Sequence, residues 1–254
     1  MIVKNLYSKG FRNFEEIEFF PSENMNVIYG DNAQGKTNLL EAIWLFCGAK
    51  SFRGAKDSEL LGFNFKKAVN SCDFIFGDVE KNAKIIIEEK RKAEFNGKML
   101  TSASKLAGNF YAIVFSPTDL NLVNDGPAVR RRFLDTAIGQ IYPLYNEKLR
   151  NYMKAVNQRN TILRDVKFHS DIEFLLDDFE NSLAFAIKEI VKYRYRYVEI
   201  LREILPEIYG GISNEKEELN IEYSSAVSKN ADISEILSIL KASRKDELYR
   251  HRGT

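Results

Sequence analysis

The first half of the chain predicts strands, because its apolar residues alternate or run together in short stretches. We expect strands at 2–7, 14–20, 25–29, 72–76, 84–88 and 111–115. One helix interrupts them, since apolar residues recur at helical spacing between Leu39 and Phe46. Asn96-Gly97 predicts a two-residue hairpin turn, because both residues tolerate positive φ.

The second half predicts helices. Ser116-Pro117-Thr118-Asp119 is typical of a helix start, with serine as N-cap and proline at the first helical position. A long helix begins at Ile172, and we expect Pro206 and Gly210-Gly211 to end it. A strand over 219–223 and a helix starting at Asp232 follow. The predicted fold class is α/β: a mixed-sheet domain over 1–125, then a mainly helical domain over 126–254.

Composition restricts the function classes only a little. The 254 residues are 44% hydrophobic and 29% charged, which is ordinary for a folded domain. The net charge of +1 gives no global attraction to DNA, so any nucleic-acid surface must be a local patch. No apolar run reaches bilayer length and the N-terminus shows no export signal, so we expect a cytoplasmic protein with no membrane partner.

One segment carries recognisable chemistry. Gly30-Asp31-Asn32-Ala33-Gln34-Gly35-Lys36-Thr37 has the GxxxxGK[ST] spacing of a phosphate-binding loop, between a predicted strand and a predicted helix. The glycines let the backbone approach phosphates, Lys36 reaches the β- and γ-phosphates, and the Thr37 hydroxyl binds Mg²⁺. We therefore predict binding of ATP and Mg²⁺. Whether the side chains of Asn32 and Gln34 bind phosphate or only shape the turn stays open.

Several strings together resemble the RecF family, in the SMC-like branch of the ABC ATPases. They are Gly10-Phe11-Arg12-Asn13-Phe14, the loop continued through Asn38-Leu39-Leu40-Glu41-Ala42-Ile43, Lys50-Ser51-Phe52-Arg53, Val114-Phe115-Ser116-Pro117-Thr118-Asp119-Leu120, and Gly126-Pro127-Ala128-Val129-Arg130-Arg131-Arg132-Phe133-Leu134-Asp135. The resemblance implies an ABC-type P-loop ATPase domain followed by a helical arm, acting in recombinational repair, replication restart and the SOS response. It implies nucleotide contacts that extend to Asn38.

The resemblance also implies partners. They are gapped duplex or single-strand–double-strand junction DNA, the mediator proteins RecO and RecR, and a second copy bound in an ATP-dependent homodimer of the complete protein. Full-length members would be weak DNA-dependent ATPases. We find no signature segment and no credible Walker B strand in this sequence. We therefore expect a C-terminally truncated chain that carries no catalytic residues and is inactive by itself.

Other charged groups allow two interpretations each. Arg12 follows the first strand and either touches ATP phosphate or is a surface arginine. Arg130, Arg131 and Arg132 open a predicted helix, and Arg130 and Arg131 are candidate contacts to DNA phosphates. In the other interpretation Arg131 and Arg132 pair with Asp135 on the helix surface, and we favour this one slightly. For the basic and aromatic run at 192–197 we favour an amphipathic helix over a nucleic-acid surface. The segment 174–178 imitates a Walker B motif, but its apolar residues follow a helical period.

Two other function classes stay open at this point. A P-loop kinase would transfer phosphate from ATP to a small molecule. A non-hydrolysing interaction module would use the nucleotide only as a structural ligand.

Overall fold

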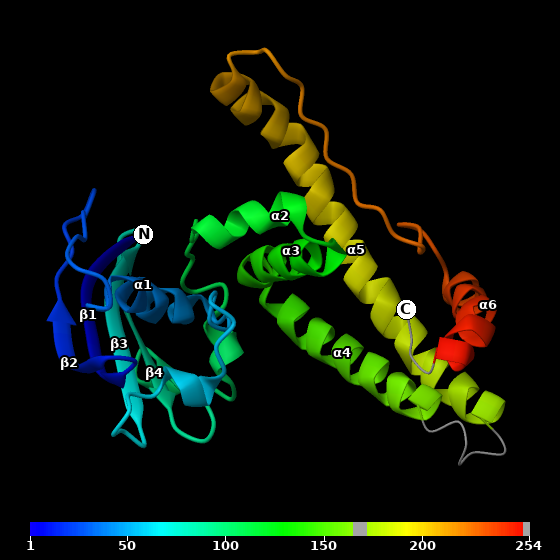
Figure 1. Cartoon of the computed structure of the whole chain (residues 1–254), viewed down its shortest axis with the longest axis horizontal. Coiled ribbons are helices and arrows are strands. Elements are labelled where there is room, and N and C mark those ends of the chain that lie inside the picture. The colour runs from blue at the N-terminus through cyan, green and yellow to red at the C-terminus, as the bar shows by residue number, and fades with distance from the viewer. Residues whose placement is uncertain (165–171, 251–254) are drawn as a thin grey trace. The chain divides into compact units, whose positions relative to one another are not determined.

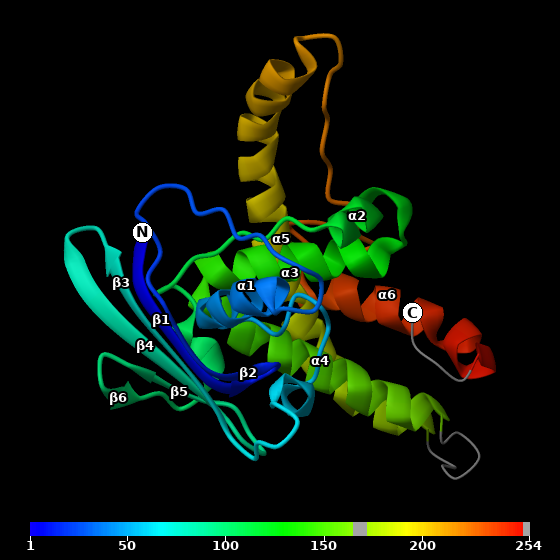
Figure 2. The same ribbon diagram turned by 60° about the vertical axis from the view of Figure 1, so that its left-hand side comes forward.

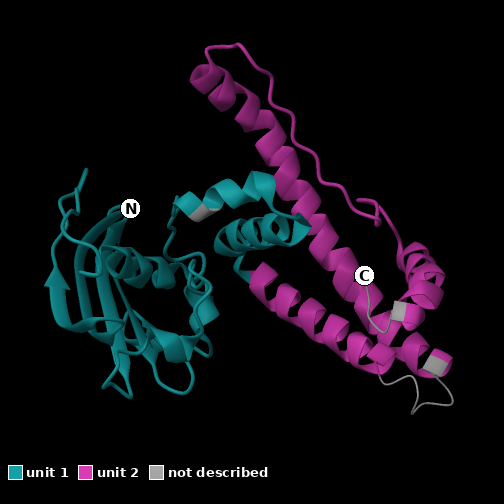
Figure 3. Cartoon of the chain, viewed as in Figure 1, with its two compact units in different colours: residues 1–143 teal, residues 144–254 magenta. Residues whose placement is uncertain are grey.

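The computed structural model describes residues 1–164 and 172–250, and the chain divides into two compact units, 1–143 and 144–254 (Figure 3). The sequence predicted a boundary near residue 125. The difference arises from helix α3, Pro127–Ile141, which side-chain hydrogen bonds tie to the first unit. Gln140 accepts from the Ala112 amide at 3.0 Å, and Arg132 donates to the Ser51 carbonyl at 3.3 Å.

A six-stranded sheet forms the centre of the first unit, in the order β2-β1-β3-β4-β5-β6 (Figure 2). Its strands are β1 Ile2–Phe11, β2 Phe14–Phe19, β3 Ala68–Phe76, β4 Val79–Ile87, β5 Lys92–Phe95 and β6 Lys98–Met99. Every strand pair is antiparallel, so the described sheet is not the mixed sheet that we predicted. The turn between β5 and β6 is confirmed, because Asn96 and Gly97 both have positive φ.

The core of this unit lies between the sheet and helix α1, Lys36–Trp44, which continues into the 3₁₀ turn η1, Leu45–Cys47. Leu6 and Phe74 from the sheet pack in one buried cluster with Ala42 and Phe46 from these helices. The predicted helical period of residues 39–46 is thus confirmed. Shorter elements close the unit: η2 Asp57–Leu60, η3 Ala103–Leu106, η4 Pro117–Leu120 and α2 Asn121–Asn124.

The predicted helix start at Ser116 is present. The Ser116 amide and hydroxyl both donate to the Asp119 carboxylate, at 2.6 and 2.8 Å, and the Asp119 amide donates back to the Ser116 carbonyl at 2.9 Å. These reciprocal bonds satisfy donors at the start of η4.

Two predicted strands, 25–29 and 111–115, are not strands in the structure. Neither is paired with another strand among the described residues, and a strand needs a neighbour to bond its backbone groups. Most of their large apolar side chains are consequently exposed, including Val27, Tyr29, Ile113 and Phe115, whereas Ala112 and Val114 pack partly against the core cluster. The apolar pattern of both segments therefore predicts buried strands, whereas most of their large apolar side chains are exposed in this structure.

The second unit is helical (Figure 1). Its helices are α4 Pro143–Arg164, α5 Ile172–Ser213 and α6 Ile233–Arg250. Contrary to the prediction, α5 continues through Pro206 and Gly210, at the loss of the one hydrogen bond that a proline nitrogen cannot donate. It ends where Asn214 and Glu215 take positive φ and the Glu215 amide donates to the Gly210 carbonyl.

The chain beyond α5 is extended but is not the strand predicted over 219–223. The predicted cap of α6 is confirmed, because Asp232 accepts a hydrogen bond from the Glu235 amide at 2.8 Å.

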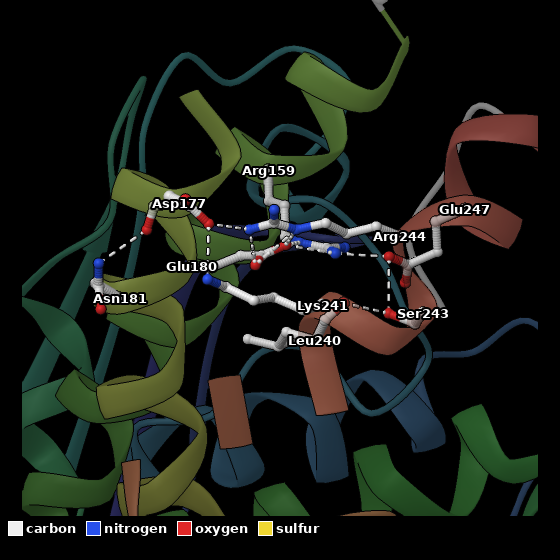
Figure 4. Close-up of polar contacts among 9 residues, drawn as sticks. All are labelled: Arg159, Asp177, Glu180, Asn181, Leu240, Lys241, Ser243, Arg244 and Glu247. Carbon is white, nitrogen blue, oxygen red and sulfur yellow. Dashed lines mark hydrogen bonds and ion pairs between the residues drawn. The ribbon is translucent and has the colours of Figure 1, made fainter. Parts of the chain in front are cut away.

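A buried cluster of charges joins the three helices of this unit (Figure 4). Glu180 on α5 has no exposed surface and accepts hydrogen bonds from Arg159 on α4 and from Arg244 on α6. Arg159 also pairs with Glu247 at 2.6 Å, and Arg244 pairs with Asp177 at 2.5 Å. Asp177 therefore belongs to a helix–helix contact. This agrees with our rejection of 174–178 as a Walker B strand.

Candidate nucleotide-binding site

The segment 30–37 forms an exposed loop that leads directly into α1. Gly30 and Gly35 have φ values of 141° and 100°, and Ala33 between them is at 67°. These conformations are costly for most residues and natural for glycine. Gly35 has no space for a larger residue, because an added Cβ would lie 2.6 Å from Phe14 Cε1. The two glycines of the motif are thus required by the backbone.

The start of α1 is suited to an anion. Gly35 is the N-cap residue, and no side chain caps the first amides of the helix. Uncapped amides at a helix N-terminus carry the positive end of the helix dipole and bind phosphate oxygens. Thr37 is exposed in the first turn, where its hydroxyl is accessible to a metal ion held by phosphates.

Lys36 reaches back across the loop. Its Nζ donates to the carbonyl oxygens of Gly30, at 2.7 Å, and of Asp31, at 2.6 Å. These two bonds hold the ammonium group beside the loop backbone, so one positive charge and the helix N-terminus lie at the same place. Asp31, Asn32 and Gln34 are exposed on this loop.

Three amide and guanidinium side chains support the loop from outside. Asn13 Nδ2 donates to the Ala33 carbonyl at 3.3 Å, and Asn13 Oδ1 accepts from Asn38 at 2.7 Å. Arg53 donates to Asn38 Oδ1 at 2.8 Å. In this structure the side chain of Asn38, which we predicted as a nucleotide contact, bonds to Asn13 and Arg53 and helps to position the loop.

Glu41 is the buried centre of the charges beneath the loop. Arg12 donates to both of its carboxylate oxygens, at 2.8 and 2.9 Å, while Ser51 also donates to it and Arg53 lies 3.5 Å away. Burial alone raises the pKa of this carboxyl. The hydrogen bonds from Arg12 and Ser51 and the charges of Arg12 and Arg53 outweigh burial, so the pKa lies below its ordinary value. Glu41 is therefore an anion at neutral pH.

Arg12 is not the surface arginine of one interpretation, because only 17% of its side chain is exposed. Its Nε and Nη2 bind Glu41 and its Nη1 donates to the Glu59 carbonyl at 2.8 Å. Its contact with ATP phosphate stays a prediction. The geometry makes Arg12 a link between the end of β1, η2 and the helix that follows the loop.

Sequence reasoning passed over Glu41, Asn13 and Arg53 as site residues. A signal for Glu41 was present, because it is the one charged residue in the otherwise apolar run 39–47. A carboxylate at a buried helix position requires a charged or hydrogen-bonding partner. The partners lie far along the chain, at 12, 51 and 53, and only the fold brings them together.

The remaining candidate residues are the arginines at the start of α3 and the basic and aromatic run at 192–197. Arg130 and Arg131 are exposed at the start of α3, and Arg130 donates to the Asp125 carbonyl at 2.8 Å. Both interpretations of these arginines stay open. The run at 192–197 is part of α5. There Arg194 is buried and donates to the hydroxyls of Tyr145 and Tyr223, both at 3.3 Å, as expected of a packed arm helix.

Comparison with known proteins decides the family. A model described as an AAA domain matches residues 5–250. The chain is 33% identical to the DNA replication and repair protein RecF of Clostridium perfringens strain 13, over 98% of this chain and 69% of that protein. It is 36% identical to RecF of Agathobacter rectalis, over 97% of this chain and 68% of that protein. This chain belongs to the RecF family.

Solved RecF structures share its fold. One, described as the recombination mediator protein RecF–ATPrS in the RecFOR pathway, superposes with a TM-score of 0.91 at 31% identity, covering 99% of this chain and 70% of that one. Another, described as RecF–ATP, gives a TM-score of 0.89. The predicted ABC-type P-loop ATPase fold with a helical region is thereby confirmed, and so is the resemblance to RecF. Among the described residues, no helix has the length and apolarity to cross a membrane.

Proposed function

We propose that this chain binds ATP with Mg²⁺ at residues 30–38 and acts as an ATP-dependent DNA-binding protein of recombinational repair and replication restart. The observation that carries the proposal is the placement of the Lys36 ammonium beside an uncapped helix N-terminus, on a loop shaped by Gly30 and Gly35. Membership of the RecF family supports it over a small-molecule kinase.

Each residue has a role in this proposal. The amides of the loop and of the first turn of α1 bind phosphate oxygens, and Lys36 exchanges its two carbonyl partners for the β- and γ-phosphates. Thr37 would hold Mg²⁺ through its hydroxyl oxygen, which is the kind of hard oxygen ligand that this cation prefers. Arg12 and Asn38 are the remaining proposed contacts, and their side chains would have to exchange their present protein partners for the nucleotide.

The proposed partners are junction or gapped DNA, RecR, RecO and a second copy of the complete protein. ATP would favour the dimer on DNA. Arg130 and Arg131 are the proposed DNA contacts, because both are exposed and clustered arginines neutralise backbone phosphates.

The test is fluorescence anisotropy of a labelled gapped duplex titrated with the complete protein, with and without ATP, over a series of salt concentrations. We expect tighter binding with ATP and a steep loss of affinity with salt. Replacing both Arg130 and Arg131 by alanine should reduce the slope of log affinity against log salt concentration by about two. A DNA affinity that changes neither with ATP nor with salt concentration would contradict the proposal.

A further inference from the structure

The distal half of α5 carries a stripe of exposed isoleucines. Ile200, Ile204, Ile208 and Ile212 follow one another every four residues, and 38%, 48%, 52% and 73% of their surfaces are exposed. Residues four apart on a helix are neighbours on its surface, so the four side chains form one continuous row. The row lies on the part of α5 that ends beside the extended chain in Figure 1.

The chain's own extended segment, residues 217–229, covers a different side of α5. Arg202 donates to the Ile221 carbonyl at 3.3 Å, Tyr195 packs against Tyr223 at 4.8 Å between ring centroids, and Lys229 pairs with Glu199 at 2.6 Å. Leu201 and Leu205, one position after two of the isoleucines, are partly covered. The isoleucine stripe itself keeps its exposure, although an apolar row of this length is typical of an interface.

A row of glutamates runs along the opposite edge of the stripe. Glu199, Glu203 and Glu207 each precede an isoleucine by one position, which is roughly 100° around the helix. Glu199 has a cation partner in Lys229. Glu203 and Glu207 are exposed, and within residues 1–164 and 172–250 no ion pair involves either of them.

The unpaired glutamates argue against a second copy of this helix as the occupant. In an antiparallel pair of identical helices related by a two-fold axis, each edge of the stripe faces the same edge of the partner. Glutamates would then face glutamates, which is destabilising. In a parallel pair the glutamate row would face the edge that holds Leu201 and Leu205, where no cation lies.

We propose that the stripe Ile200–Ile212 is a docking surface for a helix of another protein, whose own apolar stripe is flanked by lysine or arginine. The isoleucines bury apolar surface against that stripe, and Glu203 and Glu207 pair with the basic edge. This surface lies wholly within the second unit, and none of its residues belongs to the proposed nucleotide-binding segment 30–38.

The test uses two synthetic helical peptides as probes. One has a leucine stripe flanked by lysines, and its matched control has glutamates in place of those lysines. Binding to the 254-residue chain is followed by isothermal titration calorimetry. We expect the lysine peptide to bind at least about tenfold more tightly than the glutamate peptide, a difference of about 1.4 kcal/mol. The lysines would face Glu203 and Glu207, whereas glutamates in their place would face like charges.

Two variants locate the binding. Ile204→Ser with Ile208→Ser should weaken the lysine peptide about tenfold or more, because truncating central anchors removes most of an interface's energy. Glu203→Lys with Glu207→Lys should reverse the preference between the two peptides. Phe185→Ser, an equally exposed apolar side chain elsewhere on α5, is the matched control and should change neither affinity.

Circular dichroism establishes that each variant keeps its helices. Equal affinity for the two peptides, an unchanged preference after charge reversal, or binding that Phe185→Ser also removes would each overturn the proposal. Sedimentation measures whether a second copy of the chain occupies the stripe instead. Self-association of the chain that disappears in the Ile204→Ser, Ile208→Ser variant would assign the stripe to a second copy instead and overturn the proposal as well.

Discussion

Replacing Arg12 by alanine tests whether the charges beneath the phosphate loop form one structural unit. Glu41 has no exposed surface, and Arg12 supplies two of its hydrogen bonds. Removing one partner of a buried ion pair costs about 3–5 kcal/mol, because the other charge stays buried without compensation. Ser51 and Arg53 remain near Glu41, so we expect the lower end of that range, about 3 kcal/mol of unfolding free energy.

The pH dependence gives a second, independent signature. The folded-state pKa of Glu41 is lowered, so the stabilisation is fully present above the unfolded-state pKa and is lost as pH falls through the folded-state pKa. In Arg12→Ala the burial of Glu41 persists but its main pKa-lowering partner is gone, so the pKa of Glu41 rises. The difference in stability between the two proteins should therefore shrink on acidification.

The assay is urea unfolding followed by the fluorescence of Trp44, the single tryptophan, which is buried in the first unit. Lys9→Ala is the matched control, because Lys9 lies on β1, three residues before Arg12, and forms an exposed ion pair with Glu16 on β2. Such pairs contribute little, and we expect its midpoint to match the wild type. An Arg12→Ala midpoint equal to that of Lys9→Ala, at all pH values, would show that Arg12 does not stabilise the buried Glu41 carboxylate.

Three further predictions follow from single sites. Gly35→Ala should lower ATP affinity by more than about tenfold while most of the fold survives, since φ at 35 is 100° and the new Cβ would displace Phe14 at the loop; unchanged calorimetric affinity would contradict it. Glu180→Gln should lower the unfolding free energy of the helical unit by about 2–4 kcal/mol, measured by circular dichroism in urea, whereas exposed Asp178→Asn should not. Burial raises the pKa of the Cys47 and Cys72 thiols to about 12, so neither should react with Ellman's reagent near neutral pH until the chain is unfolded; fast native reaction would show that a thiol is accessible.

Local signals in the sequence were enough to locate the loop and most elements around it. The glycines at 30 and 35 and the apolar period of 39–46 act over a few residues, so their consequences can be read without the fold. The Asn96-Gly97 turn and the Asp232 cap are local in the same sense. Each of these predictions is confirmed.

Non-local effects account for what the sequence did not reveal. Residues 25–29 have strand-like composition, yet a strand exists only where a neighbouring strand bonds to it. Pro206 was expected to end α5, but the helix continues past it, because a proline removes one backbone hydrogen bond and the neighbouring turns keep theirs. The support of the loop by Glu41 and Arg12 joins positions 29 residues apart, which no local pattern can indicate.

Calorimetric titration of ATP with Mg²⁺ measures whether the loop at 30–37 binds the phosphates of ATP through Lys36. Three proteins are compared: the wild type, Lys36→Ala, and Lys98→Ala as a control that removes an exposed lysine from the β5–β6 hairpin. Circular dichroism and Trp44 fluorescence verify that all three fold alike. We expect equal ATP affinity for wild type and Lys98→Ala and no measurable binding for Lys36→Ala. Equal ATP affinity in folded Lys36→Ala would contradict it.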